Sequence, residues 1–343
     1  MTPPYIPSSQ EWIEPGSYEV APGVYRIPLP LPNDGLRAVN VYALDTDDGL
    51  TLIDGGWALP ESRHLLEAAL TERGAHLSDI RQFLVTHIHR DHYTQAVAIR
   101  RDYGCTVSVG EGERPTLELL QRSGREPFHL QVAALRASGA TALADLIGGH
   151  EPDGLDDRSD WDLPDTWLAA GPLPLAGGRV LDVVKTPGHT TGHVVFHDTT
   201  AALLFAGDHV LPTITPSIGF EPVASPDPLG AFLHSLATIR SRPDAVLLPA
   251  HGPIAASTHA RVDELIDHHG RRLDQAQAAL AQGASSAFDV AGILTWTRRE
   301  RTLPELDPFN AMLAISETAA HLDLLAAQGK IIITVEDGVR RYR

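Results

Sequence analysis

An apolar run followed by His-x-His-x-Asp-His, within residues 82–92, is the feature that most constrains the fold and chemistry of this chain. The apolar run has β-strand character, and side chains two residues apart on an extended segment project to the same side. His87 and His89 can therefore bind one metal ion together. Asp91 and His92 follow a turn and point elsewhere, toward a second ion. Because imidazole and carboxylate groups bind zinc, manganese or iron, the motif predicts a metal site at the end of a strand.

The composition is that of a globular protein with an acidic surface. The chain has 343 residues, of which 43% are hydrophobic and 21% charged, so it is long enough for one large domain and a small one. It carries 27 basic and 44 acidic side chains, a formal net charge of −17. Nucleic-acid binding depends on Lys and Arg side chains that neutralise phosphates, so this balance disfavours a nucleic-acid partner.

The cysteine content and the N-terminal sequence bear on where the protein works. Cys105 is the only cysteine, which excludes a disulfide framework and a cysteine-ligated zinc site, and its strand-like setting predicts a buried core residue. Residues 1–20 lack the basic stretch and apolar core of a signal peptide, and no apolar run approaches the roughly 20 residues of a membrane span. We therefore expect a soluble, cytoplasmic protein with no membrane partner.

Strand and helix patterns alternate along the first part of the chain, which predicts an α/β layered domain. The expected strands are residues 24–29, 39–44, 50–53, 83–86 and 106–110, and the expected helices are 60–74 and 93–103. Residues 111–171 form a helical insertion, with helices at 117–121, 131–137 and 142–147 and an acidic loop at 151–161. A substrate cap and padding on the far face are both open interpretations of this insertion.

The second part of the chain predicts a return to strands and then a helical C-terminal region. Strands are expected at residues 180–185, 194–197, 202–205 and 245–248, with a Pro-rich loop at 211–228 and a helix at 229–240. Helices at 258–282, 286–297 and 308–329 precede a hairpin of 331–335 and 339–342, an order typical of a winged helix. We expect a catalytic domain of residues 1–262 and a C-terminal domain of 263–343.

The last expected helix has an apolar stripe that needs a partner surface. Leu313, Ser316-Glu317, Ala320 and Leu324 lie on one face of a helix at this spacing. The stripe could cover the open edge of the metal site, or it could pack against a second subunit and form a homodimer.

The motif at residues 87–92 supplies only part of two coordination shells, so it predicts further ligands downstream. Three candidates each follow an expected strand: His189, Asp208 and His251. Loops at strand ends are where α/β sheets build their sites. Glycines flank all three candidates and allow the backbone to turn tightly there, at positions 188, 207 and 252.

These motifs, taken in order, resemble the metallo-β-lactamase-fold hydrolase superfamily. The matching elements are Asp54-Gly55-Gly56, the motif at 87–92, Pro187-Gly188-His189-Thr190, Gly207-Asp208 and Ala250-His251-Gly252. The resemblance covers about residues 20–260 and implies a four-layer αββα sandwich. Residues 317–325 and 329–331 resemble the winged-helix domain of one branch, which includes lactamase-beta-like and glyoxalase II-like proteins.

The resemblance also implies a ligand set for two divalent metal ions, with zinc expected first and manganese or iron as alternatives. His87, His89 and His189 would hold one ion, and Asp91, His92 and His251 the other. Asp208 would bridge the two ions together with a water or hydroxide. Asp54 either orients a ligand imidazole or is a turn residue. His193 and His209 are expected to be structural or ligand-supporting, and His268 and His269 to be solvated helix positions.

Three departures from the family pattern narrow the activity. Tyr93 stands where a small residue is usual, and it either reaches the substrate or packs its ring in the core. Asp208 replaces the cysteine of lactam-hydrolysing zinc enzymes, which disfavours β-lactamase activity. No basic cluster typical of a nuclease stands beside the motif, despite Arg90 within it.

The expected reaction is hydrolysis of an ester, thioester or lactone of a small molecule, by a thioesterase or lactonase type of enzyme. Two ions can activate water, polarise a carbonyl and stabilise a leaving group, with Asp91 and Asp208 as the catalytic carboxylates. Gly-x-Ser-x-Gly is absent, so no covalent nucleophile is apparent. Residues 111–171 and 211–228 are expected to shape the pocket. The alternatives are a metal-dependent endoribonuclease or phosphodiesterase, a mononuclear-iron persulfide dioxygenase, and a metal-bound regulator without activity.

Overall fold

Two β-sheets form the centre of the protein, seen here in a computed structural model that describes residues 11–32, 35–122, 128–149, 158–223 and 225–343. Within these residues the first sheet has seven strands in sequence order. Neighbours β1 to β4 pair antiparallel, and β4 to β7 pair parallel. The strands are β1 (Tyr18–Ala21), β2 (Val24–Pro30), β3 (Ala38–Thr46), β4 (Gly49–Ile53), β5 (Ile80–Val85), β6 (Thr106–Gly110) and β7 (Thr166–Leu168).

The second sheet contains five of the described strands, in the order β12-β11-β10-β9-β8. β11 and β12 are parallel, and the other neighbours are antiparallel. The strands are β8 (Gly171–Pro174), β9 (Val180–Lys185), β10 (Val194–Asp198), β11 (Leu203–Gly207) and β12 (Val246–Pro249). The sequence patterns predicted most of these strands, but not the short strands β1, β7 and β8.

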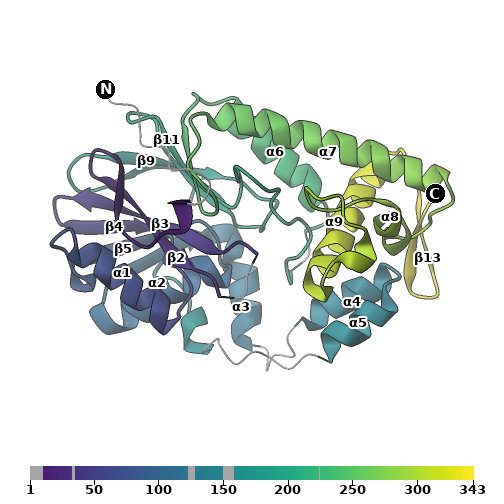
Figure 1. Ribbon diagram of the computed structural model, residues 1–343, viewed down its shortest axis with the longest axis horizontal. Helices are drawn as coiled ribbons and strands as arrows, with labels where there is room; N and C mark the ends of the chain where they lie inside the picture. Colours follow the sequence, from purple (N-terminus) through teal and green to yellow (C-terminus); the bar gives the residue numbers. More distant parts are fainter. Residues whose placement is uncertain (1–10, 33–34, 123–127, 150–157, 224) are drawn as a thin grey trace.

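Helices cover the outer face of each sheet and build a separate group at the C-terminal end (Figure 1). The α-helices are α1 (Pro60–Thr71), α2 (Arg90–Tyr103), α3 (Arg114–Arg122), α4 (His129–Ala137), α5 (Thr141–Gly148), α6 (Pro228–Arg240), α7 (Thr258–Ala281), α8 (Ala287–Ile293) and α9 (Pro308–Ala327). Short 3-10 helices lie at Glu11–Ile13, Leu77–Asp79, Glu111–Glu113, Arg158–Trp161 and Leu303–Glu305.

Three buried apolar clusters hold four layers together in the order expected for an αββα sandwich. Side chains of α1 and α2 pack against the first sheet, as Leu66 and Val97 do against Phe83. A second cluster, which includes Tyr42 and Phe205, fills the space between the sheets. The third joins the second sheet to α6 and α7. Burial of apolar side chains between layers is the main favourable term in folding such a structure.

The helical insertion and the C-terminal helices share a fourth apolar cluster. Leu135 of α4 and Ile147 of α5 pack with Met312 and Leu322 of α9. α7 runs along the top of the molecule and connects the sandwich to this helical group (Figure 1). The acidic loop expected at 151–161 lies largely outside the described residues.

The C-terminal region has the expected order of three helices and an antiparallel hairpin, β13 (Ile333–Glu336) and β14 (Val339–Tyr342). The helix expected at 286–297 ends early, because Leu294 is already extended (ψ 155°) and Thr297 is left-handed (φ +64°). The apolar stripe of α9 packs within the chain, since Ala320 and Leu324 contact the cluster that contains α6 and α7.

The expectation for His269 was wrong. Its side chain is fully buried between α7 and α9, with Nδ1 3.2 Å from Nε2 of His321, whereas His268 is half-buried. Adjacent residues on a helix point about 100° apart, so one of the two can face a covering helix while the other stays near solvent.

Candidate metal centre

The loops that follow four strands bring the motif histidines and their predicted partners to one end of the sandwich. His87 and His89 lie between β5 and α2, and His189 follows β9. Ring nitrogens of His89 and His189 are 3.1 Å apart, and the ring of His87 lies 4.9 Å from that of His189. One ligand atom from each of these three histidines and from Asp208 lies within 4.8 Å of the others. This group is called cluster A.

A second group of ligand atoms, cluster B, comes from Asp91, His92 and His251. Asp91 and His92 occupy the first turn of α2, which begins at Arg90 rather than after His92. Nε2 of His251, in the loop after β12, is 3.3 Å from Oδ2 of Asp91. Nε2 of His92 is 3.6 Å from the same oxygen.

Asp208, directly after β11, lies between the two clusters and turns one oxygen toward each. Oδ2 is 3.4 Å from Nε2 of His189 in cluster A. Oδ1 is 3.3 Å from Nε2 of His251 and 3.7 Å from Nε2 of His92 in cluster B. A carboxylate in this position can bind two cations at once, one through each oxygen.

Hydrogen bonds on the far side of three rings, those of His92, His189 and His251, fix these histidines with Nε2 toward the site. His189 Nδ1 donates to the carbonyl of Ser217 (2.8 Å), and His251 Nδ1 donates to the carbonyl of Ala38 (2.8 Å). His92 Nδ1 lies 2.9 Å from Oδ2 of Asp54. Such contacts set the tautomer and orientation of metal-binding imidazoles.

Asp54 supports both clusters. It is 2% exposed and accepts hydrogen bonds from the backbone N–H and the hydroxyl of Thr86. Because the Thr86 hydroxyl donates to Asp54, its oxygen can accept a hydrogen bond from Nδ1 of His87, 3.1 Å away. Asp54 therefore orients a ligand imidazole, and it is also a turn residue, with a φ of +61° that non-glycine residues rarely adopt.

Several buried atoms at the centre lack a hydrogen-bond partner, which is the observation that fits a metal ion. They are Nε2 of His87, His92 and His251 and Oδ1 of Asp208. Buried polar atoms without partners are costly in a folded protein. A divalent cation coordinated by these atoms would satisfy them, and nitrogen and oxygen donors of this kind suit zinc, manganese or iron.

The electrostatics of the two clusters differ. Burial lowers the pKa of His89 to about 3 and that of His189 to about 4, so both rings are neutral and have a free lone pair at pH 7. Burial also lowers the pKa of His92, but the carboxylates of Asp91, Asp54 and Asp208 outweigh burial and raise it to about 10. Cluster B therefore holds a proton that a metal ion has to displace.

His193 and His209 have the supporting positions expected for them. Both are fully buried. Nε2 of His193 accepts a hydrogen bond from the backbone N–H of Asp208 (3.2 Å), and its Nδ1 is 2.9 Å from the hydroxyl oxygen of Thr186. His193 thus holds the backbone of Asp208 in place, and the ring of His209 packs between those of His193 and Phe232.

Glu113 is a supporting residue that the sequence patterns did not identify. It is fully buried, accepts a hydrogen bond from the hydroxyl of Thr190, and bonds to the backbone of Ile88. It therefore connects the loop that carries His87 and His89 to the loop that carries His189. Glu113 belongs to an ordinary Glu-Gly-Glu segment, so no local signal marks it.

Tyr93 packs in the core and does not reach the site. Its ring is fully buried against the first sheet, and its hydroxyl donates to the carbonyl of Asp162 (2.5 Å). The alternative of a substrate contact for Tyr93 was therefore wrong. Cys105 is buried in the same apolar cluster, as expected.

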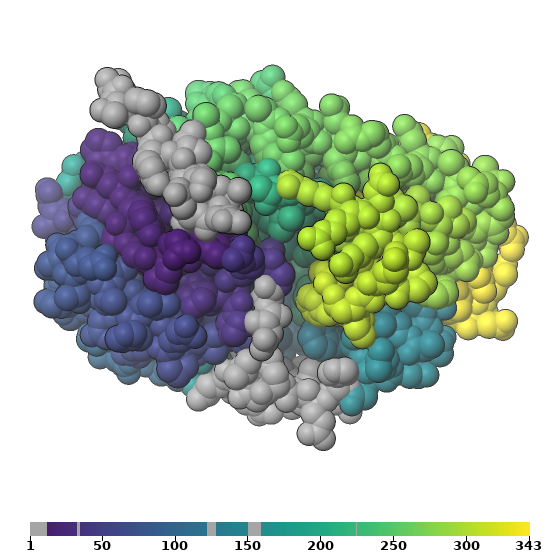
Figure 2. All heavy atoms as spheres, in the orientation of Figure 1, coloured from purple at the N-terminus to yellow at the C-terminus, as the bar shows by residue number. Residues whose placement is uncertain are grey.

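An aromatic group lies beside cluster A. The ring of Phe220, from the loop before α6, lies 6.4 Å from that of His89. It also lies 6.3 Å from Phe128, next to α4, and 5.6 Å from Phe309 of α9. Phe128 and Phe309 are 36% and 44% exposed, so the three rings form a surface rather than a closed core. The space-filling view shows a hollow between the sandwich and the C-terminal helices (Figure 2).

Comparison with known proteins identifies the family to which this fold belongs. The Metallo-beta-lactamase superfamily profile matches residues 34–251. Similar solved structures include a metallo-beta-lactamase family protein from Thermus thermophilus, 26% identical with a TM-score of 0.75 over 94% of this chain and 99% of that one. A beta-lactamase domain protein from Burkholderia ambifaria is 25% identical, with a TM-score of 0.72 over 95% and 94% of the two chains.

Three relatives carry descriptions of activity. The probable metallo-hydrolase YqjP of Bacillus subtilis is 25% identical over 89% of this chain and 92% of its own length. An atrochrysone carboxyl ACP thioesterase of Emericella nidulans is 23% identical over 94% of this chain and 85% of its own. A hydroxyacylglutathione hydrolase of Rhizobium johnstonii is 27% identical over 43% of this chain and 40% of its own. With its profile match across most of the sandwich, this chain belongs to the metallo-beta-lactamase superfamily of enzymes.

Proposed function

We propose that this protein is a dinuclear metal-dependent hydrolase that cleaves an ester, thioester or lactone of a small molecule. The position of Asp208 carries the proposal, because one of its oxygens faces each cluster. Oδ2 lies 3.4 Å from Nε2 of His189 in cluster A, and Oδ1 lies 3.3 Å from Nε2 of His251 in cluster B. When bound, two divalent ions would supply an activated water, polarise the acyl carbonyl and stabilise the leaving group.

The residues of the chain have distinct roles in this proposal. His87, His89 and His189 would hold one ion and Asp91, His92 and His251 the other, and Asp208 would neutralise part of the charge of both. In this proposal Asp91 would also accept a hydrogen bond from the attacking water and direct it at the carbonyl. Asp54 and His193 keep these groups in position.

A covalent route is not supported by the side chains present. Cys105, the one cysteine, is buried away from the site, and burial raises the pKa of its thiol to about 11. A thiol of that kind is a poor nucleophile near neutral pH. Direct attack by water therefore fits the chain better than an acyl-enzyme intermediate.

The substrate we propose has an apolar acyl part. Phe220, Phe128 and Phe309 present partly exposed rings next to His89, and aromatic surface of this kind stabilises apolar groups by burial. The rings come from the loop at 211–228, the insertion at 111–171 and α9, which supports the expectation that these segments shape the pocket. The thioesterase and hydroxyacylglutathione hydrolase among the relatives favour a thioester.

We also propose that residues 263–343 form a winged-helix domain on a catalytic domain of residues 1–262. The division falls within α7, whose early residues Val262 and Leu265 pack on the sandwich and whose later residues Ala276 and Ala279 pack on the C-terminal helices.

None of the helices in the described part of the chain has the length and hydrophobicity that a bilayer span requires. The homodimer stays a prediction.

Hydrolysis assays on metal-loaded protein test the reaction. We expect cleavage of thioesters or lactones in a panel that also contains cyclic nucleotides, RNA and a persulfide, with activity lost to a chelator and restored by zinc or manganese. In heavy-oxygen water the label should enter the product acid. RNA cleavage without acyl hydrolysis would instead establish a nuclease, oxygen consumption with a persulfide would establish a dioxygenase, and metal binding without turnover would indicate a regulator.

A further inference from the structure

A chain of hydrogen-bonded histidines lies outside the candidate metal centre, between α7 and α9. Nδ1 of His269 is 3.2 Å from Nε2 of His321, and Nδ1 of His321 is 2.7 Å from the backbone carbonyl oxygen of Glu317. His269 is fully buried and His321 is 2% exposed. Phe232 separates this group from the metal centre, because its ring lies 5.1 Å from His209 on one side and 5.5 Å from His269 on the other.

The direction of these hydrogen bonds fixes which nitrogens carry protons. The carbonyl of Glu317 can only accept, so Nδ1 of His321 carries a proton. Nε2 of the neutral His321 ring then has a lone pair and accepts from Nδ1–H of His269. The remaining nitrogen of His269, Nε2, is therefore left with a lone pair. This atom is buried and has no hydrogen-bond partner.

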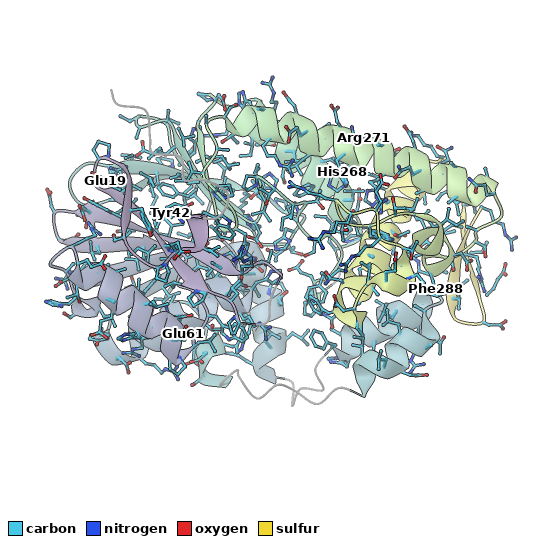
Figure 3. The ribbon with its side chains drawn as sticks, in the orientation of Figure 1. Glu19, Tyr42, Glu61, His268, Arg271 and Phe288 are labelled. Carbon is cyan, nitrogen blue, oxygen red and sulfur yellow. The ribbon has the colours of Figure 1, made fainter. Side chains whose placement is uncertain are left out.

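Two further metal-binding groups lie next to His269. A ring nitrogen of His268 and a carboxylate oxygen of Glu317 lie with a ring nitrogen of His269 within 4.8 Å of one another, the same limit met by clusters A and B. His268 is half-buried and lies on the inward side of α7, below the helix in Figure 3, whereas Arg271 is exposed. Burial raises the pKa of Glu317, which indicates a carboxylate with too little compensating positive charge.

We propose that His268, His269 and Glu317 form a further divalent-cation site, separate from the candidate metal centre, with zinc as the best-suited ion. Two imidazoles and a carboxylate leave a fourth position for water in tetrahedral zinc. The Nδ1–H of His269 is oriented by His321, as expected for a metal-binding imidazole. An ion here would connect α7 to α9 and so fix the C-terminal helices against the helix that joins them to the sandwich.

The positive charge of Arg272 acts on all three residues of the proposed site and sets a limit on affinity. The Arg272 guanidinium stacks over Trp296 at 4.2 Å and donates to the carbonyl of Thr295 at 3.1 Å, so it is held by groups other than Glu317. Burial lowers the pKa of His268 and of His269, and the charge of Arg272 lowers both further. Zinc should therefore bind this site more weakly than the centre around Asp208.

Zinc titration of the full-length, chelator-stripped protein tests the proposal. We expect wild type to bind one more equivalent of zinc than His269→Ala or Glu317→Gln, measured by elemental analysis after dialysis and by calorimetry. The wild-type unfolding temperature should rise over this weakest zinc equivalent, and the variants should lack that part of the rise. The matched control is His197→Ala, which removes a buried histidine of β10 outside the proposed site and should keep the wild-type zinc count.

The count does not depend on the reaction that the enzyme catalyses, so it separates this proposal from the proposed function. Circular dichroism checks that each variant is folded. If His269→Ala does not fold, two milder variants give the same test. Glu317→Gln conserves the side-chain shape and His268→Ala removes a half-buried ring, and each should bind one equivalent of zinc fewer than wild type. Equal zinc counts in wild type and in the folded variants would overturn the proposal.

Discussion

Oδ2 of Asp54 lies 2.9 Å from Nδ1 of His92, although 38 residues separate them in the sequence. The same carboxylate accepts the hydroxyl proton of Thr86, whose oxygen in turn faces Nδ1 of His87. One buried side chain thus orients a ligand in each of the two clusters. Asp54 adopts a left-handed backbone conformation to do so, and the surrounding hydrogen bonds offset that strain.

Replacing Asp54 with alanine should weaken metal binding more than it weakens the fold. His92 and Thr86 lose their acceptor, so we expect metal affinity to fall roughly 10- to 100-fold, with a corresponding loss of activity at limiting metal. The control is Asp198→Ala, which removes another buried carboxylate that accepts two backbone N–H groups far from the clusters. That variant should lower the unfolding temperature and leave metal affinity unchanged. Equal metal affinities for the two variants would contradict the role of Asp54.

Gly207 is the last residue of β11 and immediately precedes Asp208. A Cβ at this position would lie 2.6 Å from Oγ1 of Thr86 and 2.8 Å from Nε2 of His193. Gly207→Ala should therefore displace Thr86, which is hydrogen-bonded to Asp54, and His193, which is hydrogen-bonded to Asp208. A shift of about 1 Å at a reacting group can reduce turnover on the order of 100-fold.

The matched control for this glycine is Gly104→Ala. Gly104 is also left-handed (φ +73°), but no atom lies within 4 Å of the position that a Cβ would take, so the substitution strains the backbone without a clash. It should cost roughly 1–2 kcal/mol of stability and leave kcat close to wild type. If both variants keep full activity, the close approach at Gly207 has no part in holding the site.

Phe220 should determine how well the enzyme uses apolar acyl groups. Removing its ring from the surface beside His89 should lower kcat/KM for a benzoyl or octanoyl thioester roughly tenfold, through loss of apolar contact. An acetyl thioester of the same thiol should be affected little. Phe288→Ala, which removes an exposed ring from α8, is the control and should not change the ratio. A uniform fall for all acyl lengths in Phe220→Ala would argue for a general packing role.

Metal uptake at cluster B should release protons, whereas uptake at cluster A should not. The pKa of His92 is raised to about 10 in the metal-free protein, so His92 carries a proton at pH 7 and has to lose it to bind a cation. Affinity at cluster B should therefore increase with pH up to about 10. His89 and His189, with pKa values of about 3 and 4, are already neutral, so affinity at cluster A should be nearly constant above about pH 5.

Calorimetry in buffers of different ionisation enthalpy measures this proton release. The heat of the binding phase assigned to cluster B should vary with the buffer, and that phase should disappear in His251→Ala. A binding heat that is the same in every buffer would show that His92 is neutral in the metal-free protein.

The sequence predicted the candidate ligands because each one follows a strand within a short, recognisable motif. Two of the contacts that orient them were not predictable in this way. The acceptor for His251 is the carbonyl of Ala38, 213 residues away, and the acceptor for His189 is the carbonyl of Ser217. Backbone carbonyls carry no residue signature, and their positions depend on how the layers pack.

Tyr93 and His269 show a second limit of sequence reasoning. Both lie on helices whose burial depends on a distant element: Tyr93 packs against the first sheet and contacts Asp162, and His269 is covered by α9. The polarity of a single side chain does not reveal which helix face is covered. Long-range packing, rather than local pattern, decided these two positions.

Anomalous diffraction from crystals of the zinc-loaded protein tests the dinuclear centre most directly. At this centre we predict two zinc peaks, one on each side of the Asp208 carboxylate, with His87, His89 and His189 around one and Asp91, His92 and His251 around the other. A single peak bound by one cluster, or zinc peaks only at residues outside both clusters, would contradict the account.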